Sequence, residues 1–291
     1  MFEGSYVALV TPFHEDGSVN YEKLKELCNW HVENGTDGIV VLGTTGESST
    51  TEHAEDAAIV RCTVDAIAGR IPVIAGGGSN STETSLMKSR TFRDCGVDGL
   101  LLITPYYNKA NQRGMYRHFQ TVVDQVDLPA ILYNVPSRTG CALSVDCVAE
   151  LSKHKNIRGI KEASGDISYA AKIARICNDE FVMMSGNDDM IVPILSLGGT
   201  GVISVFANIC PKETHEIVAS WKTGDVARSR ELQLKYLPLI NALFIEVNPI
   251  PVKEAMNHLG MGAGGYRLPL CEMDPKNRAV LHEALRVLEG A

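Results

Sequence analysis

The chain has 291 residues, of which 45% are hydrophobic and 21% are charged, a composition typical of a globular protein without long disordered stretches. Its net charge of −8 arises from scattered acidic residues with no basic stripe, which argues against nucleic acid as a partner. No segment approaches the ~18 uninterrupted apolar residues of a membrane span. Residues 1–13 lack the basic start of a signal peptide, so we expect a cytoplasmic protein.

Short apolar runs alternate with longer helical patterns over the first three quarters of the chain. Most of the short runs are continuously apolar, which is typical of strands that are covered on both faces, as in a parallel sheet. The predicted strands are 6–10, 38–42, 72–75, 99–103, 130–133, 157–161, 181–185 and 201–204.

The segments between these strands carry helical periodicity together with start and stop residues. We expect the first helix to begin at Asn20 and to stop at Gly35, and the second to begin at Thr50 or Thr51. The other helices are predicted at about 81–95, 111–125, 144–153, 168–177, 189–197 and 211–222.

Strands that are each followed by a helix predict a closed (β/α)₈ TIM barrel, an α/β fold, with an open doubly wound sheet as the alternative. After about residue 224 the strand signals stop, and three helical segments follow at 225–246, 251–259 and 274–288. We therefore expect a catalytic barrel over residues 1–223 and a C-terminal helical domain over residues 224–291. No Pro/Ser-rich linker separates the two, so the helical appendage should pack against the barrel.

The chemistry of a parallel barrel lies at the C-terminal ends of its strands, where Lys161 ends the sixth predicted strand. A lysine in water has a pKa near 10.4, which leaves only about one amine in 2,500 neutral at pH 7. A desolvated barrel mouth can lower that pKa enough to make the amine a Schiff-base nucleophile. The alternative is a surface lysine whose stem lies along apolar neighbours.

Other strand ends carry hydroxyl groups and a guanidinium group. Tyr133 could pass protons at the neighbouring strand end, or could be an aromatic packing residue. Thr44 and Thr45 lie between glycines and could hold a carboxylate, or could simply form a turn. Arg138 could bind a carboxylate in a bidentate way, or could be a solvated loop residue.

Two kinds of site are not indicated by the sequence. The 8 cysteines and 8 histidines form no CxxC, HxH or HExxH pattern, so no metal site is signalled, a metal-dependent hydrolase is not favoured, and reduced thiols are expected. The glycine-rich segment 76–79 lacks the lysine of a P-loop, and segment 198–201 is typical of a tight turn before a strand. Neither segment is assigned to a nucleotide.

The motifs at the strand ends, in this order, resemble the dihydrodipicolinate synthase family, also called the 4-hydroxy-tetrahydrodipicolinate synthase family. The match extends over essentially the whole chain, and its two longest motifs together are highly specific. The matching motifs are VLGTTGE (41–47), TPYY (104–107), YNVPSRTG (133–140), GIKEAS (159–164), SGND (185–188) and NPIPVK (248–253).

The resemblance implies a lyase of the class I aldolase type that joins pyruvate, as a Schiff base, to L-aspartate 4-semialdehyde on the route to diaminopimelate and lysine. It also implies no dissociable cofactor and a homotetramer built as a dimer of dimers. By resemblance, Lys161 forms the Schiff base, and Tyr133, Thr44 and Tyr107 form a proton relay, with Tyr107 from the neighbouring subunit. Arg138 would support the relay and receive the carboxylate of the aldehyde substrate. The residues implied in the pyruvate pocket are Thr45, Gly186 and Ile203.

Many members of this family are inhibited by lysine at a subunit interface. In this chain Asp56 stands where a sensitive enzyme usually has histidine, and Thr84 stands where it usually has glutamate. The ammonium group of the effector would then lack one partner, unless Asp56 or Glu83 replaces it, so we expect weak or absent inhibition by lysine. The other matching effector positions are Ser48, Ser49, His53, Asn80 and Tyr106.

Two alternative functions stay open at this point. One is a related lyase, either an N-acetylneuraminate lyase or a keto-deoxy sugar acid aldolase, which would cleave rather than condense. The loop 137–140 argues against it, because a sugar acid has no matching need for Arg138. The other is a non-catalytic binding barrel, which would be expected to have lost part of the amine, phenol and hydroxyl set.

Overall fold

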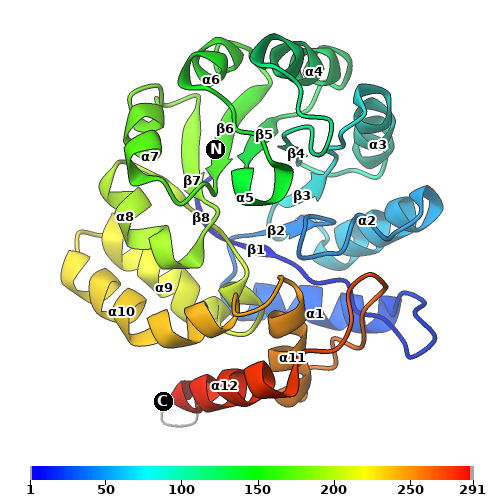
Figure 1. Ribbon diagram of the computed structural model, residues 1–291, viewed down its shortest axis with the longest axis vertical. Coiled ribbons are helices and arrows are strands. Elements are labelled where there is room, and N and C mark those ends of the chain that lie inside the picture. The colour runs from blue at the N-terminus through cyan, green and yellow to red at the C-terminus, as the bar shows by residue number, and fades with distance from the viewer. Residues whose placement is uncertain (1, 289–291) are drawn as a thin grey trace.

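Parallel strands close into a barrel in chain order, β1 to β8, in the computed structural model, which describes residues 2–288 (Figure 1). Each strand pairs with the next, and β8 returns to pair with β1. The predicted (β/α)₈ barrel is therefore confirmed, and the open doubly wound alternative is wrong. The strands are β1 (Gly4–Ala8), β2 (Gly38–Val41), β3 (Val73–Gly76), β4 (Gly99–Ile103), β5 (Ala130–Asn134), β6 (Ile157–Glu162), β7 (Val182–Ser185) and β8 (Gly201–Ser204).

Two apolar clusters cover the two faces of this sheet. The inner cluster fills the barrel with side chains such as Tyr6, Val40 and Ile203, and Tyr133 belongs to it. The larger outer cluster joins the opposite faces of the strands to the helices. Because both faces are covered, the strands appear in the sequence as continuous apolar runs rather than as alternating ones.

Helices cover the outside of the barrel between successive strands (Figure 1). Asn20 caps the first helix as predicted, since its side chain accepts a backbone N–H from the first turn. The predicted start of the second helix at Thr50 or Thr51 is wrong, because Glu52 forms a capping box with Glu55. The α-helices between residues 2 and 222 are α1 (Tyr21–Glu33), α2 (His53–Ile67), α3 (Thr82–Asp94), α4 (Gln112–Gln125), α5 (Pro136–Thr139), α6 (Val145–Leu151), α7 (Ile167–Ala174), α8 (Ile191–Ser196) and α9 (Pro211–Lys222).

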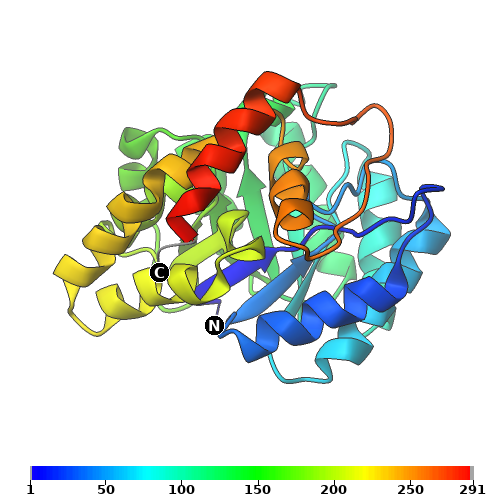
Figure 2. The same ribbon diagram turned by 90° about the horizontal axis from the view of Figure 1, so that it is seen from below.

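The chain after α9 is helical, with α10 (Val226–Ala242), α11 (Ile250–His258) and α12 (Pro275–Leu285). Helix α10 packs beside α9 and α12, and α11 packs on α12. The connection between α11 and α12 extends to the segment before α1, where the guanidinium of Arg267 donates to the carbonyl oxygen of Gly17 at 2.8 Å (Figure 2). Among residues 2–288, no helix combines the length and the apolar character that crossing a bilayer requires.

The two glycine-rich segments are places where backbone approaches backbone. A Cβ on Gly76 would lie 2.0 Å from the carbonyl oxygen of Leu42, and one on Gly201 would lie 1.9 Å from that of Gly4. The first glycine lets β3 pass close to the end of β2, and the second lets β8 pass close to β1. Glycine in these segments is therefore explained by the closure of the barrel.

Candidate active site

Lys161 and Tyr133 lie side by side at the C-terminal end of the barrel. They are register partners on the neighbouring strands β5 and β6, and both are buried, with 5% and 6% of their surfaces exposed. The Nζ atom of Lys161 lies 4.4 Å from the centre of the Tyr133 ring. The amine is therefore held inside the barrel beside a phenol, and the alternative of a surface lysine is wrong.

Gly186 leaves room for the Lys161 side chain. It follows β7, and its N–H donates to the carbonyl oxygen of Glu162 at 2.7 Å. A Cβ at this position would lie 3.0 Å from Cε of Lys161 and 2.6 Å from Cβ of Ala163. Any larger residue would therefore have to displace the lysine chain or the backbone of β6.

Thr44 and Thr45 form a tight turn after β2. The turn is closed by backbone hydrogen bonds from Gly46 to Gly43 and from Glu47 to Thr44, each 3.1 Å long. Within residues 2–288, the N–H groups of Thr44 and Thr45 donate to no other group of the chain. Two adjacent free N–H groups are donors that can together receive a carboxylate.

A cavity of about 430 Å³ opens next to this turn. Tyr133 and Thr44 line its inner part, and the residues of the outer part come from the loop before α2, from α2 and α3, and from the loop after β4. Lys161 and Thr45 adjoin this space without lining it. The other lining residues are Leu42, Gly43, Ser48, Ser49, Thr51, His53, Gly76, Gly78, Ser79, Thr84, Lys88, Leu101, Ile103, Tyr106, Arg138 and Thr139.

Arg138 lines the cavity from the short helix α5. Pro136 begins this helix and Gly140, with φ of +69°, ends it, an arrangement that favours a single helical turn. The side chain of Arg138 is exposed, and its Nη2 donates to the carbonyl oxygen of Asn248 at 3.2 Å. The guanidinium retains further donors for an incoming anion.

Of the remaining predicted site residues, two are buried and one is exposed to solvent. Ile203 is fully buried inside the barrel. The hydroxyl of Thr45 is also buried and accepts a hydrogen bond from Nδ2 of Asn248 at 3.0 Å. Tyr107 is 89% exposed and has φ of +71°, so it does not join the cavity of its own chain.

The outer part of the cavity contains most of the predicted effector positions. Ser48, Ser49, His53 and Tyr106 line it, whereas Asn80 is outside the lining and accepts a hydrogen bond at its carbonyl oxygen from Asn108.

Asp56 beside this outer part is already paired. Its carboxylate lies 3.1 Å from Nζ of Lys88 and accepts a hydrogen bond from the Thr51 hydroxyl at 2.6 Å. The role of Lys88 was not predicted, because no local pattern indicates that a lysine in α3 is buried against an acid in α2.

Two buried carboxyl groups near Lys161 were also not predicted from the sequence. Burial raises the pKa of Glu162, whose carboxylate accepts hydrogen bonds from Asn134 and Ser164. Burial likewise raises the pKa of Asp188, which accepts the N–H groups of Val205 and Phe206 at 3.0 and 2.9 Å. Glu162 thus joins the ends of β5 and β6, and Asp188 joins the ends of β7 and β8. Within the described residues, no group of His, Cys, Asp and Glu side chains has the arrangement of a metal site.

Comparison with known proteins gives matches over nearly the full length. The sequence model of the dihydrodipicolinate synthetase family matches residues 1–288. A 4-hydroxy-tetrahydrodipicolinate synthase of Clostridium perfringens is 52% identical over 286 residues, which cover 98% of this chain and 98% of the relative.

Two solved structures show the same fold at substantial identity. The chloride-inhibited dihydrodipicolinate synthase of Acinetobacter baumannii complexed with pyruvate is 41% identical, with a TM-score of 0.97 and 99% of each chain covered. The DHDPS of Cyanidioschyzon merolae with lysine bound is 37% identical, with a TM-score of 0.96 over 99% of this chain and 98% of that chain. The family model, the sequence relatives and the solved structures all match this chain over nearly its full length. The chain is therefore an enzyme of the dihydrodipicolinate synthetase family.

Proposed function

We propose that this enzyme is a 4-hydroxy-tetrahydrodipicolinate synthase that condenses pyruvate with L-aspartate 4-semialdehyde. The neutral amine of Lys161 adds to the ketone carbon of pyruvate, and the carbinolamine loses water to give a Schiff base. Loss of a methyl proton gives an enamine, whose carbon attacks the aldehyde carbon while the aldehyde oxygen gains a proton. The amino group of the aldehyde substrate then displaces Lys161 from the imine carbon, which closes the ring and frees the amine. The observation that carries this proposal is the buried amine of Lys161, 4.4 Å from the centre of the Tyr133 ring.

Tyr133 and Thr44 are assigned the proton transfers. Tyr133 is adjacent to the amine and also lines the cavity, so its phenol can donate and accept protons as the carbinolamine forms and collapses. Thr44 lines the same part of the cavity and can connect the phenol to solvent or to a further hydroxyl. In this proposal, Tyr107 of a second subunit completes the relay, which agrees with the 89% exposure of its side chain.

Pyruvate is held by its carboxylate at the Thr44–Thr45 turn. The free N–H groups of this turn provide donors in a fixed direction, and the Thr45 hydroxyl, anchored by Asn248, provides another. Gly186 and Ile203 border the space around the methyl and carbonyl groups. This arrangement needs no dissociable cofactor.

The assembly proposed for this enzyme is a cytoplasmic homotetramer, built as a dimer of dimers. The free state of the chain's 8 cysteines fits a reducing compartment. Mass photometry or sedimentation at working concentration measures the assembly, and a monomer with full activity would contradict the role of Tyr107.

The reaction itself is tested by supplying pyruvate with L-aspartate 4-semialdehyde and following the product by mass spectrometry. The matched control supplies N-acetylneuraminate and keto-deoxy sugar acids and measures pyruvate release. Condensation without sugar acid cleavage is expected. Efficient pyruvate release from a sugar acid would contradict the proposed specificity.

Replacing Arg138 with alanine is expected to raise the KM for L-aspartate 4-semialdehyde by about tenfold to a hundredfold. The reason is that a hydrogen bond to a charged group contributes about 1.5–3 kcal/mol. Steady-state kinetics with each substrate varied in turn measures the effect, and the KM for pyruvate should change much less. Arg138→Lys should recover only part of the loss, since an ammonium group does not bind a carboxylate in a bidentate way. An unchanged aldehyde KM would leave the arginine without this role.

L-Lysine is expected to inhibit weakly or not at all. Thr84 offers no carboxylate, the Asp56 carboxylate is already paired with Lys88, and Glu83 is exposed outside the cavity lining. An effector ammonium entering the outer cavity would therefore meet no free acid among these residues. Initial rates at increasing lysine concentrations measure the effect, with calorimetric titration as a direct binding control. Half-inhibition at sub-millimolar lysine would contradict the prediction.

A further inference from the structure

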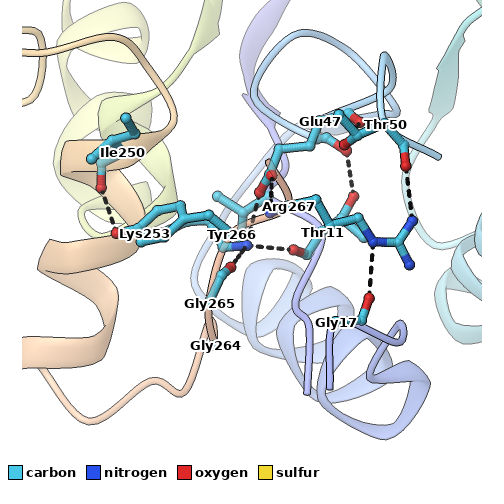
Figure 3. A network of polar contacts seen from close by, with 12 residues as sticks. Thr11, Gly17, Glu47, Thr50, Ile250, Lys253, Gly264, Gly265, Tyr266 and Arg267 are labelled. Carbon is cyan, nitrogen blue, oxygen red and sulfur yellow. Dashed lines mark hydrogen bonds and ion pairs between the residues drawn. The ribbon is translucent and has the colours of Figure 1, made fainter. Parts of the chain in front are cut away.

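Lys253 in α11 is completely buried, and its ammonium group contacts the loop that carries Thr44 and Thr45. Its Nζ atom donates to Oε1 of Glu47 at 2.9 Å, to the carbonyl oxygen of Thr11 at 3.0 Å and to that of Gly265 (Figure 3). These acceptors use all three protons of the ammonium group. The cation also lies 4.3 Å from the centre of the Phe13 ring.

The second oxygen of Glu47 is held by the same C-terminal segment. Oε2 of Glu47 accepts the N–H of Arg267 at 3.2 Å. The guanidinium of Arg267 donates to the carbonyl oxygen of Thr50 at 2.9 Å (Figure 3). It also pairs with Glu55 at 2.7 Å. Residues 47–55 are thus attached at several points to the chain between α11 and α12.

The turn between β2 and Glu47 has an unfavourable local conformation. Leu42 and Glu47 flank it, and each has φ of +53°, a region that residues other than glycine rarely occupy. Such a turn needs support from surrounding structure. Two other contacts supply part of that support: Asn248 donates to the Thr45 hydroxyl, and the Thr11 hydroxyl donates to the carbonyl oxygen of Gly46 at 2.6 Å.

Stability alone does not explain a buried ion pair at this place. Taking two charges out of water costs several kcal/mol per ion, and apolar residues of similar volume often replace such a pair without loss. Burial lowers the pKa of Lys253, which shows the direction of this cost. The pair instead fixes a position, because the fully hydrogen-bonded ammonium group of Lys253 holds the Glu47 carboxylate in one place.

We propose that Lys253 and Glu47 are positioning residues that hold the Thr44–Thr45 turn at the correct distance from the Lys161 amine. The pair connects the C-terminal helical region to the loop whose free N–H groups receive the pyruvate carboxylate. This inference rests on the proposed role of the turn in pyruvate binding. The inference also gives the C-terminal helical domain predicted from the sequence, residues 224–291, a direct part in the site through Lys253.

The test compares Lys253→Met, Glu47→Gln and the double variant with the wild type. Each single variant is expected to raise the KM for pyruvate by about tenfold, since displacing a binding group by a fraction of an ångström already weakens a site. The KM for the aldehyde should change less. Each single change leaves one buried charge without its partner, so both single variants should also melt at lower temperatures than the wild type.

The double variant separates positioning from stability. It removes the unpaired charge, so its melting temperature should rise toward that of the wild type while the pyruvate KM stays high. Recovery of both the melting temperature and the pyruvate KM would overturn the inference, as would an unchanged pyruvate KM in all three variants.

A matched control is Leu281→Ala, which removes a buried side chain of α12 away from the turn. It should lower the melting temperature by a comparable amount and leave the pyruvate KM unchanged, and an equal rise in KM would overturn the inference. Borohydride trapping of pyruvate on the wild type is measured in parallel. If the wild type traps no pyruvate, the proposed function fails and the inference with it, whereas normal trapping with unchanged variants overturns the inference alone.

Discussion

Lys161→Ala is expected to abolish the attachment of pyruvate to the enzyme under borohydride and to reduce kcat to the background rate. Without the amine no Schiff base forms, and no other step of the proposed reaction can begin. Intact-protein mass spectrometry after reduction detects the adduct, and peptide mapping locates it.

The control for this change is Lys155→Ala, which removes an exposed lysine whose ammonium lies 3.4 Å from Asp127. Its adduct and kcat should equal those of the wild type. If Lys161→Ala still forms an adduct, the nucleophile is a different lysine, and the assignment of the whole site is wrong.

Tyr133→Phe is expected to lower kcat by roughly 10²-fold or more. The ring still fills the inner end of the cavity, so the lost hydroxyl, rather than lost packing, accounts for the decrease. Stopped-flow measurement of Schiff-base formation should show the same decrease, because the phenol acts as the carbinolamine forms and collapses. Pyruvate binding should be much less affected.

A matched control is Tyr236→Phe, which removes the hydroxyl of another buried tyrosine, in α10, outside the cavity lining. It should leave kcat unchanged. A near-normal kcat in Tyr133→Phe would remove the phenol from the mechanism, and an equal decrease in both variants would indicate a general effect of losing a buried hydroxyl.

The strand order and the approximate positions of the strands follow from the sequence because each strand is a continuous buried apolar run between helical segments, although β1 begins and ends two residues earlier than predicted. The residue at which a strand ends is less predictable where a polar residue extends the strand. Strands β5 and β6 each continue one residue further than predicted, to Asn134 and Glu162, which are register partners joined by a hydrogen bond of 2.8 Å. A polar pair of this kind is visible only when both strands are in place. Helix α5 was missed because 4 residues are too few to show periodicity.

The residues proposed to react can be picked out in the sequence because they stand at or just after the C-terminal ends of strands, and the barrel brings these strand ends together. The residues that support them are not predictable in this way. Asn248 and Thr45 are 203 residues apart, and Lys253 and Glu47 are 206 residues apart. Lys253 lies in a helical pattern, where a lysine is expected on the solvent face. Only the packing of α11 against the loops before α1 and α2 places it in the interior.

The closed ring of strands limits how two copies of this protein can associate. Every strand from β1 to β8 has a partner on both sides, so the sheet within residues 2–288 has no unpaired edge. A second molecule therefore cannot add a strand to it, and association by sheet extension, a common route to aggregation, is closed. Contacts between copies must use helices and loops, and substitutions in those elements can change the assembly without disturbing the hydrogen bonds of the barrel.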